Sequence, residues 1–476
     1  MNSIIRKAML EVLPTESFNT GNPPEPKELY IPSSHKKSLE LYSNLIIGAR
    51  GVGKSTWTTA LADQNLRTII GANIPELENA IVHIGFSEKP DQENYPTTDI
   101  FNELLQRQFQ PYEIWKTIII RWISHEINQK IPSVDWPASV SWVKENTESC
   151  DRILQEGNHL FKSKGQNGLV LFDALDRTSD NWESMDAIVR DLLRLVIRLK
   201  ANTNIHTKVF LREDQFSRNV TNFPDASKLL STKTELDWFL HDLHGLLWQL
   251  LCNATEEGGN ILRNFYKEAM GVEPELKGDY WVISDEAKRD EAKQRNLFKN
   301  IAGSWMGKDK RRGVPYLWSV RHLSDGKGGI SPRSFLAAIR SAVEDSSHRI
   351  SEYPLHYESI KKGVQRASSI RINEMAEDYP WVKDVCEPLR NLVVPIEFTK
   401  IEERWNNKYP NGPHDIKSDR LPPQDLNKGW HGIQDELVRL GIFEENRDRR
   451  INMPDLYRVG FGLGRRGGVT PIMKEK

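Results

Sequence analysis

The stretch from Leu45 to Thr56 constrains the fold of this chain more than any other part of the sequence. It reads LIIGARGVGKST and matches the pattern G-x-x-x-x-G-K-[ST] at every fixed position. The apolar residues at its start predict a buried strand, the glycines a tight loop, and the residues after the loop the first turn of a helix. A strand, a glycine-rich loop and a helix in this order predict an α/β domain with a parallel sheet.

This loop has the chemistry of a phosphate site. Its backbone N–H groups can all turn inward and form a concave nest for anionic oxygens. Lys54 supplies a positive charge for the β and γ phosphates, and Ser55 is placed to ligate Mg²⁺ at the positive end of the helix. The residues predicted to bind the nucleotide are Gly48, Ala49, Arg50, Gly51, Val52, Gly53, Lys54, Ser55 and Thr56. A chance match in a flexible turn is the alternative, and the strand and helix that flank the loop argue against it.

Length and composition limit the remaining choices. A chain of 476 residues should contain more than one domain. Its 65 basic and 66 acidic residues nearly cancel, which argues against a protein that coats nucleic acid and leaves room only for a local basic patch. The three cysteines lie far apart and predict neither disulfides nor a zinc site. We find no signal peptide and no apolar run long enough to span a membrane, so we expect a cytoplasmic protein with no membrane partner.

A second acidic motif follows an apolar run. The segment Gly168–Phe172 has strand length and ends in Asp173, which has the form of a Walker B strand. The carboxylate at its end would hold Mg²⁺ through water beside the glycine-rich loop. A buried strand followed by an acidic turn is the alternative.

Further strands are predicted over Ala80–Phe86 and Thr207–Leu211, with helical regions at 100–130 and 182–200. Arg212 ends the second of these strands and is a candidate sensor of the γ-phosphate. The equally weighted alternative is an arginine paired with Glu213 or Asp214.

The rest of the chain is mainly helical. An apolar helix over 235–252 should close the first domain. In a later segment Ser331 has the position of an N-cap and Pro332 that of the first helical residue, so Arg333 would face a bound nucleotide from a helix N-terminus. Near the C-terminus, strands at 442–443 and 450–454 joined by a polar turn suggest a winged helix. The domains expected are an N-terminal arm (1–40), a P-loop NTPase domain (41–252), a helical lid (253–345), a helical connector (346–390) and a winged-helix domain with a tail (391–476).

This ordered set of motifs resembles the AAA+-related ATPases of the STAND class and their relatives in the KAP and origin-recognition groups. The segment DALDR, residues 173–177, is similar to the STAND form of the Walker B motif and to the D-D-L-D-R of KAP ATPases. The segment from Gly329 to Arg333 is similar to the sensor 2 element at the start of a lid helix. The resemblance implies an α/β P-loop NTPase domain of AAA+ type followed by helical and winged-helix domains, with ATP and Mg²⁺ as cofactors.

One position departs from the AAA+ pattern. Ordinary AAA+ proteins carry a catalytic glutamate directly after the Walker B aspartate, and Ala174 stands there in this chain. The attacking water would then have to be oriented by another group, and we nominate Asp176. The predicted catalytic residues are Lys54, Asp173, Asp176 and Arg212, with Ser55 and Asp173 as metal ligands and Pro332 and Arg333 as further nucleotide contacts.

These features favour a slowly hydrolysing ATP-dependent switch that works with a protein partner or by self-association. A role in bacterial stress or phage defence rests on family analogy alone. The alternative is a DNA-associated ATPase whose winged helix binds nucleic acid. Its basic side chains are Arg447, Arg449, Arg450, Arg465, Arg466 and the cluster at 308–312. A scaffold that binds nucleotide permanently is a third reading.

Overall fold

The computed structural model describes residues 1–15, 21–132, 135–218 and 220–472. Apart from those gaps, the chain forms two compact units. One, here called the sheet unit, comprises Thr20–Pro26 and Ser33–Leu236. The other, here called the helical unit, comprises Met1–Asn19, Lys27–Pro32 and Asp237–Lys476. Each unit is described by itself below.

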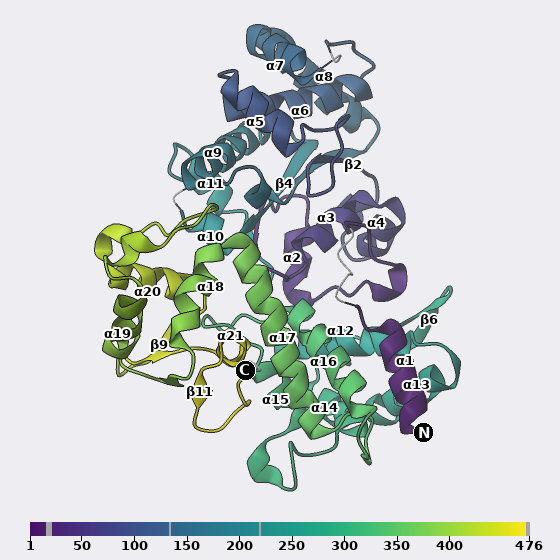
Figure 1. Ribbon diagram of the computed structural model, residues 1–476. Coiled ribbons are helices and arrows are strands. Elements are labelled where there is room, and N and C mark those ends of the chain that lie inside the picture. Colours follow the sequence, from purple (N-terminus) through teal and green to yellow (C-terminus); the bar gives the residue numbers. More distant parts are fainter. Residues whose placement is uncertain (16–20, 133–134, 219, 473–476) are drawn as a thin grey trace. The chain divides into compact units, whose positions relative to one another are not determined.

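The sheet unit is built on five parallel strands (Figure 1). They are β1 (Leu45–Gly48), β2 (Ala80–Phe86), β3 (Asn167–Phe172), β4 (Ile205–Arg212) and β5 (Lys233–Glu235). Their order across the sheet is β2-β3-β4-β1-β5, so β4 lies between the strand of the glycine-rich loop and the strand that ends before Asp173. The predicted parallel sheet is confirmed, and the unit has an α/β fold.

Burial explains why these segments become strands. Every residue of β1 and β4 is buried, as expected for inner strands of a parallel sheet that is covered on both faces.

The helices of this unit are α2 (Lys36–Leu39), α3 (Lys54–Ala62), α4 (Gln64–Gly71), α5 (Thr98–Gln106), α6 (Pro111–Glu126), α7 (Trp136–Glu145), α8 (Thr147–Ser163), α9 (Trp182–Leu199), α10 (Glu213–Phe216) and α11 (Ala226–Leu230).

The connection between β2 and β3 carries four helices, α5 to α8, which gather in one cluster (Figure 1). The sequence predicts one long helical region over 100–130, and the structure divides it into α5 and α6. The break has a local cause, because Gln108 takes a positive φ of 68° and Pro111 is the first residue of α6. α6 packs against α7, α8 and α9.

The helical unit begins with α1 (Asn2–Val12), which packs against helices from the second half of the chain. The other helices are α12 (Leu240–Cys252), α13 (Glu256–Met270), α14 (Glu291–Ala302), α15 (Pro315–Arg321), α16 (Pro332–Ser346), α17 (Tyr357–Asp378), α18 (Pro380–Cys386), α19 (Phe398–Lys408), α20 (Trp430–Arg439) and α21 (Asp455–Phe461). The short strands are β6 (Glu275–Lys277), β7 (Tyr280–Val282), β8 (Val393–Val394), β9 (Glu444–Glu445), β10 (Ile451–Asn452) and β11 (Gly464–Arg465). Antiparallel pairs form between β6 and β7 and between β9 and β10.

Two expected boundaries differ from the structure. The helix predicted over 235–252 begins only at Leu240, and Glu235 is instead the last residue of β5. That helix, α12, packs against α1, α13, α14 and α16 and therefore belongs to the helical unit rather than closing the P-loop domain. The predicted N-terminal arm is also divided, because α1 and Lys27–Pro32 belong to the helical unit.

The C-terminal hairpin lies close to its predicted place, with its first strand shifted by two residues. Ile442 and Phe443 are not in a strand, because both backbone N–H groups donate to the carbonyl oxygen of Leu437 at the end of α20. The strand starts at Glu444 instead, and the turn between β9 and β10 carries Arg447 and Arg449. An isolated antiparallel bridge joins Ile396 to Ile451 beside this hairpin.

Across the described ranges, none of the helices combines the length and apolar character that a membrane span requires.

Lys208 is a buried cation in the centre of the sheet. Its ammonium group donates to the carbonyl oxygens of Ser38 (2.8 Å), Ser43 (3.1 Å) and Glu40. Burial lowers the pKa of Lys208 to about 7. The three carbonyls belong to the segment that leads into β1, so this lysine ties the start of the glycine-loop strand to β4.

We expect Lys208→Met to lower the free energy of unfolding by about 2–4 kcal/mol, because three buried carbonyl groups lose their donor. Denaturant titration followed by circular dichroism measures this loss. Lys200→Met is the matched control, since exposed Lys200 donates to only one backbone carbonyl, that of Lys228, and should cost about 0.5 kcal/mol. Equal losses in the two variants would show that the buried lysine has no special role.

In the helical unit, His244 is a fully buried histidine. Its ring stacks on Tyr316 with centroids 4.0 Å apart and meets the rings of Phe298 and Phe335 edge-on. Nε2 lies 3.0 Å from the carbonyl oxygen of Tyr316, to which it donates in the neutral ring. Burial lowers the pKa of His244 to about 3.

Because this pKa is lowered in the folded state, His244 stabilises the fold above its ordinary pKa and that contribution is lost as the pH falls toward the folded value. Between about pH 7 and about pH 5 the expected loss is about 2 kcal/mol of unfolding free energy. Denaturant titrations at both pH values should show this loss reduced in His244→Gln. The control His125→Gln removes an exposed histidine and should leave the pH dependence unchanged. An unaltered pH dependence in His244→Gln would contradict the assignment.

Candidate functional site

The glycine-rich loop follows β1 and leads directly into α3, whose first residue is Lys54. Gly51 and Gly53 have φ values of 80° and 102°, which only glycine adopts without strain. A Cβ atom on Gly48 would lie 2.6 Å from Cγ2 of Val52, so this position also requires glycine. The loop therefore takes its shape from three glycines that sequence reasoning identified.

Lys54 folds back over the loop. Its ammonium group donates to the carbonyl oxygens of Gly48 (2.9 Å) and Ala49 (2.8 Å). Burial, together with the positive charge of Arg212, lowers the pKa of Lys54 to about 8. Three carboxylates act in the opposite direction, those of Asp173, Asp176 and Asp214. The predicted catalytic lysine thus lies within electrostatic reach of every acidic residue of the site.

Asp173 directly follows β3 and is 3% exposed. Burial raises the pKa of its carboxyl group, while a hydrogen bond with the Ser55 side chain and the charge of Lys54 lower it. Ser55 and Asp173 thus present two hard oxygen atoms side by side. In the described ranges no group of three or more His, Cys, Asp or Glu side chains is arranged to hold a metal ion. Two adjacent protein oxygens fit Mg²⁺, which usually keeps several waters and phosphate oxygens as ligands.

The backbone turns sharply after Asp173. Ala174 takes φ 56° and ψ 33°, in the left-handed region that a residue with a Cβ atom seldom occupies. The short 3₁₀ helix Leu175–Arg177 follows at once. This turn brings the next acidic residue, Asp176, back toward the end of β4, where its carboxylate meets Arg212.

Arg212 lies between two carboxylates. Its Nη1 is 3.0 Å from Oδ2 of Asp176, and its Nε is 3.5 Å from Oδ1 of Asp214. All three side chains are largely buried, with exposed fractions of 11%, 21% and 16%. Register places Arg212 directly beside Gly48 of β1, and its backbone N–H donates to the side chain of Gln215. The ion pair with Asp214 is one of the two pairings named from the sequence, the role of Arg212 as a sensor of the γ-phosphate stays a prediction, and the pairing with Asp176 was not foreseen.

The pairing with Asp214, one of the two named from the sequence, has a local signal. An acidic residue two positions after a strand-end arginine lies in the first turn of the following helix, where its charge is favourable. The pairing with Asp176 had no such local signal, because the two partners are separated by a whole helix and a strand.

The other predicted nucleotide contacts, Pro332 and Arg333, belong to the helical unit. Pro332 is the first residue of α16, as predicted, although Ser331 makes no side-chain capping bond. Arg333 donates from Nη1 to Oε1 of Glu374 at 2.8 Å. Glu374 also pairs with the buried Arg371 of α17 at 3.4 Å. Both arginines nominated as phosphate sensors are therefore held by carboxylates of their own unit.

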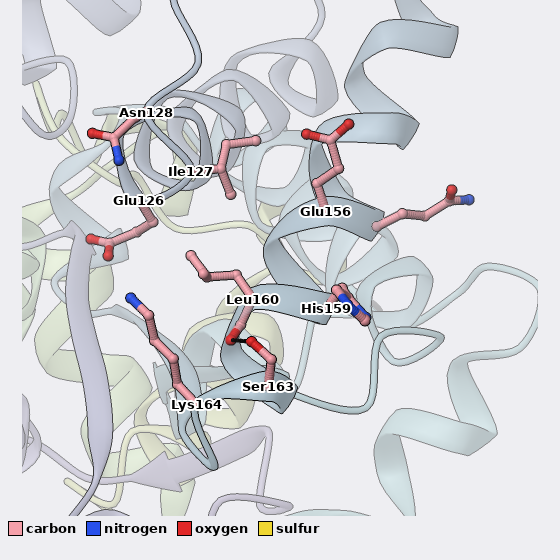
Figure 2. A pocket seen from close by; sticks show the side chains of 9 residues that line it. Glu126, Ile127, Asn128, Glu156, His159, Leu160, Ser163 and Lys164 are labelled. Atoms are coloured by element: carbon pink, nitrogen blue, oxygen red, sulfur yellow. Dashed lines mark hydrogen bonds between the residues drawn. The ribbon is translucent and has the colours of Figure 1, made fainter.

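A shallow hollow of about 520 Å³ lies elsewhere in the sheet unit, between the end of α6 and α8. Figure 2 shows Glu126 and Lys164 on one side of it and Glu156 and His159, both from α8, on the other. Its charged groups have mixed signs and do not converge on one point. It is separate from the glycine-rich loop, and we assign it no function.

No known family profile and no curated protein matches this chain. Solved structures do match it. The Aeropyrum pernix ORC2 protein, in its ADPNP-ADP complexes, is 12% identical with a TM-score of 0.43, covering 94% of each chain. The Walker-type ATPase PABY2304 of Pyrococcus abyssi is 11% identical with a TM-score of 0.41, covering 92% of this chain and 98% of that one. C. elegans PCH-2 is 8% identical with a TM-score of 0.26, covering 78% and 66%. Because these values are low, we base the function on the residues of this chain.

We expect Arg212→Met to lower the free energy of unfolding of the sheet unit by about 2–4 kcal/mol, because two largely buried carboxylates lose their cation. Denaturant titration measures the loss. The control Arg194→Met removes a half-exposed arginine that pairs with Asp191, and should cost about 0.5 kcal/mol. A loss in Arg212→Met no larger than that of the control would show that the pair contributes nothing to stability.

Proposed function

We propose that this protein binds ATP with Mg²⁺ and hydrolyses it slowly, as a molecular switch. The observation that carries the proposal is the position of Arg212 beside Gly48, bound to Asp176, in a site where Ala174 replaces the usual catalytic glutamate. A site of this composition favours binding of the triphosphate over its rapid cleavage.

The phosphates would lie in the nest formed by Gly48, Ala49, Arg50, Gly51, Val52, Gly53, Lys54, Ser55 and Thr56. Lys54 would exchange its two loop carbonyls for phosphate oxygens, which are stronger acceptors because they are charged. Ser55 and Asp173 would hold Mg²⁺, which neutralises charge that develops on the phosphates during hydrolysis.

Asp176 is the residue we assign to the orientation of the attacking water. Its carboxylate pairs with Arg212 at 3.0 Å, so its negative charge is already partly compensated. A carboxylate paired in this way is a poor proton acceptor until the arginine moves. Slow hydrolysis follows from that pairing.

The switch would act through the same arginine. A γ-phosphate beside the end of β4 competes with Asp176 and Asp214 for Arg212, and a ligand can shift a conformational equilibrium only through contacts made in one state. Pro332 and Arg333 would contribute when the helical unit closes on the nucleotide, with Arg333 leaving Glu374. The lid, connector and winged-helix domains would then carry the change to a protein partner or to a second copy of the chain.

DNA binding by the C-terminal region is the second candidate. The bridge from Ile396 to Ile451 beside the β9–β10 hairpin supports a winged-helix arrangement, with Arg447 and Arg449 exposed on the turn. The tail contributes less than we expected, because Arg465 is engaged with Asp455 at 3.0 Å and with Asn452. A role in stress response or phage defence stays a hypothesis from analogy.

The proposal predicts that Lys54→Ala abolishes ATP binding and that Asp176→Asn binds ATP but loses about 10²-fold in turnover. Isothermal titration calorimetry with Mg²⁺-ATP and a phosphate-release assay measure the two effects. Glu88→Gln is the control for removal of a nearby carboxylate, since Glu88 lies on the surface and pairs with Arg177, and it should leave turnover unchanged.

Two outcomes would contradict these assignments. If Asp176→Asn hydrolyses ATP at the rate of the unaltered protein, another group orients the water. If the unaltered protein fails to bind Mg²⁺-ATP, the proposed function is wrong as a whole. The switch is tested by limited proteolysis, in which a non-hydrolysable ATP analogue and ADP should give different cleavage patterns.

A further inference from the structure

The loop between α14 and α15 in the helical unit is a closed basic loop. A backbone hydrogen bond of 2.8 Å from Met306 N–H to the carbonyl oxygen of Gly313 closes it. The exposed cations Lys308, Lys310, Arg311 and Arg312 lie within it, against one acidic residue, Asp309. Asp309 pairs with Arg311 at 3.0 Å. In the part of the chain that the structure describes, no ion pair neutralises Lys308, Lys310 or Arg312.

A hollow of about 400 Å³ lies at the base of this loop. It is lined by Trp305, Gly307, Ile350, Tyr353, His356 and Tyr357, among others. Trp305 is 36% exposed and Ile350 is fully exposed, although both are large and apolar. Such residues at the surface mark a binding site more often than a packing defect when they surround a concavity.

The ring of Tyr353, one wall of the hollow, packs against the backbone at Gly303. Gly303 ends α14 with φ 73°, and a Cβ atom there would lie 2.9 Å from the ring of Tyr353. The glycine therefore allows the tyrosine ring to lie close to the backbone. The rings of His356 and Tyr357, 4.3 Å apart, extend the aromatic surface along the segment that leads into α17.

Aromatic faces beside unpaired cations match one class of partner best. Unpaired bases stack on tryptophan and tyrosine, while a basic loop neutralises the phosphates that join them. The volume suits one nucleoside, whereas a base within a duplex cannot present its face to a ring. An acidic peptide would satisfy the cations and leave the aromatic lining unused. The carboxylate of Glu352, which also lines the hollow, is suited to accept from the amino group of a base.

We propose that the hollow lined by Trp305 and Tyr353, together with the basic loop at 308–312, binds single-stranded nucleic acid. One base enters the hollow and stacks on its aromatic wall, and the adjoining phosphates lie along Lys308, Lys310 and Arg312. This site is separate from the β9–β10 hairpin, and it does not depend on the proposed ATPase.

Fluorescence anisotropy of a labelled oligothymidylate with the full chain tests this site. We expect Trp305→Ala to weaken binding about tenfold, because one stacked base is lost. Lys310→Gln/Arg312→Gln should weaken it by a similar factor and reduce the salt slope by about 1.4, because two phosphate contacts are lost from a single strand. Arg447→Gln/Arg449→Gln removes the same charge from the hairpin and should leave single-strand binding unchanged. Circular dichroism establishes that each variant is folded, and Tyr353→Leu provides a second probe of the aromatic wall.

The other outcomes each overturn the proposal. If the charge variants weaken binding while Trp305→Ala and Tyr353→Leu do not, the hollow takes no base. If an equally long duplex binds more tightly, with loss only in the hairpin variant, the nucleic-acid surface is the hairpin. If polyglutamate competes as well as unlabelled oligothymidylate, the loop selects negative charge alone. Lys54→Ala should bind the oligonucleotide normally, so failure of this proposal is distinguishable from failure of the proposed ATPase.

Discussion

The candidate site depends on the order of three adjacent strands in the sheet, β3, β4 and β1. Because β4 lies between β1 and β3, the residue at its end, Arg212, is beside Gly48 on one side and beside the acidic turn on the other. Parallel strands end at the same edge of a sheet, so the glycine-rich loop, Asp173 and Arg212 meet without any long connection. Lys208, in the middle of β4, supports this arrangement because it holds the segment that enters β1.

The chemistry of the site depends on the two carboxylates that bind Arg212. Arg212 is bound by both Asp176 and Asp214, and the left-handed residue Ala174 is what turns Asp176 toward it. A residue with a Cβ atom in this conformation is kept there only when its surroundings require it. On the function proposed above, a bound phosphate would disturb this arrangement of one arginine and two carboxylates.

The main strands could be predicted from the sequence because their cause is local. A run such as Leu169 to Phe172 is apolar throughout, and only burial on both faces of a parallel sheet suits it. The unit boundary could not be read in this way. α12 is apolar nearly all round, which predicts burial, but the sequence does not say which unit supplies the contacts. The short β9 strand also depends on context, since Ile442 and Phe443 look like a strand and instead close the end of α20.

The sequence by itself determined the glycine-rich loop, the glycines that it needs, the parallel sheet and the acidic residue that follows β3. Each of these depends on backbone sterics or on burial within a few residues, which the chain order already contains. Only the tertiary structure decided that Arg212 pairs with Asp176 and Asp214, that Glu374 holds Arg333, and that aromatic residues surround a hollow under the basic loop. Those outcomes depend on contacts between side chains of segments that are distant in the sequence. Such a contact produces no periodic pattern in the sequence of either segment.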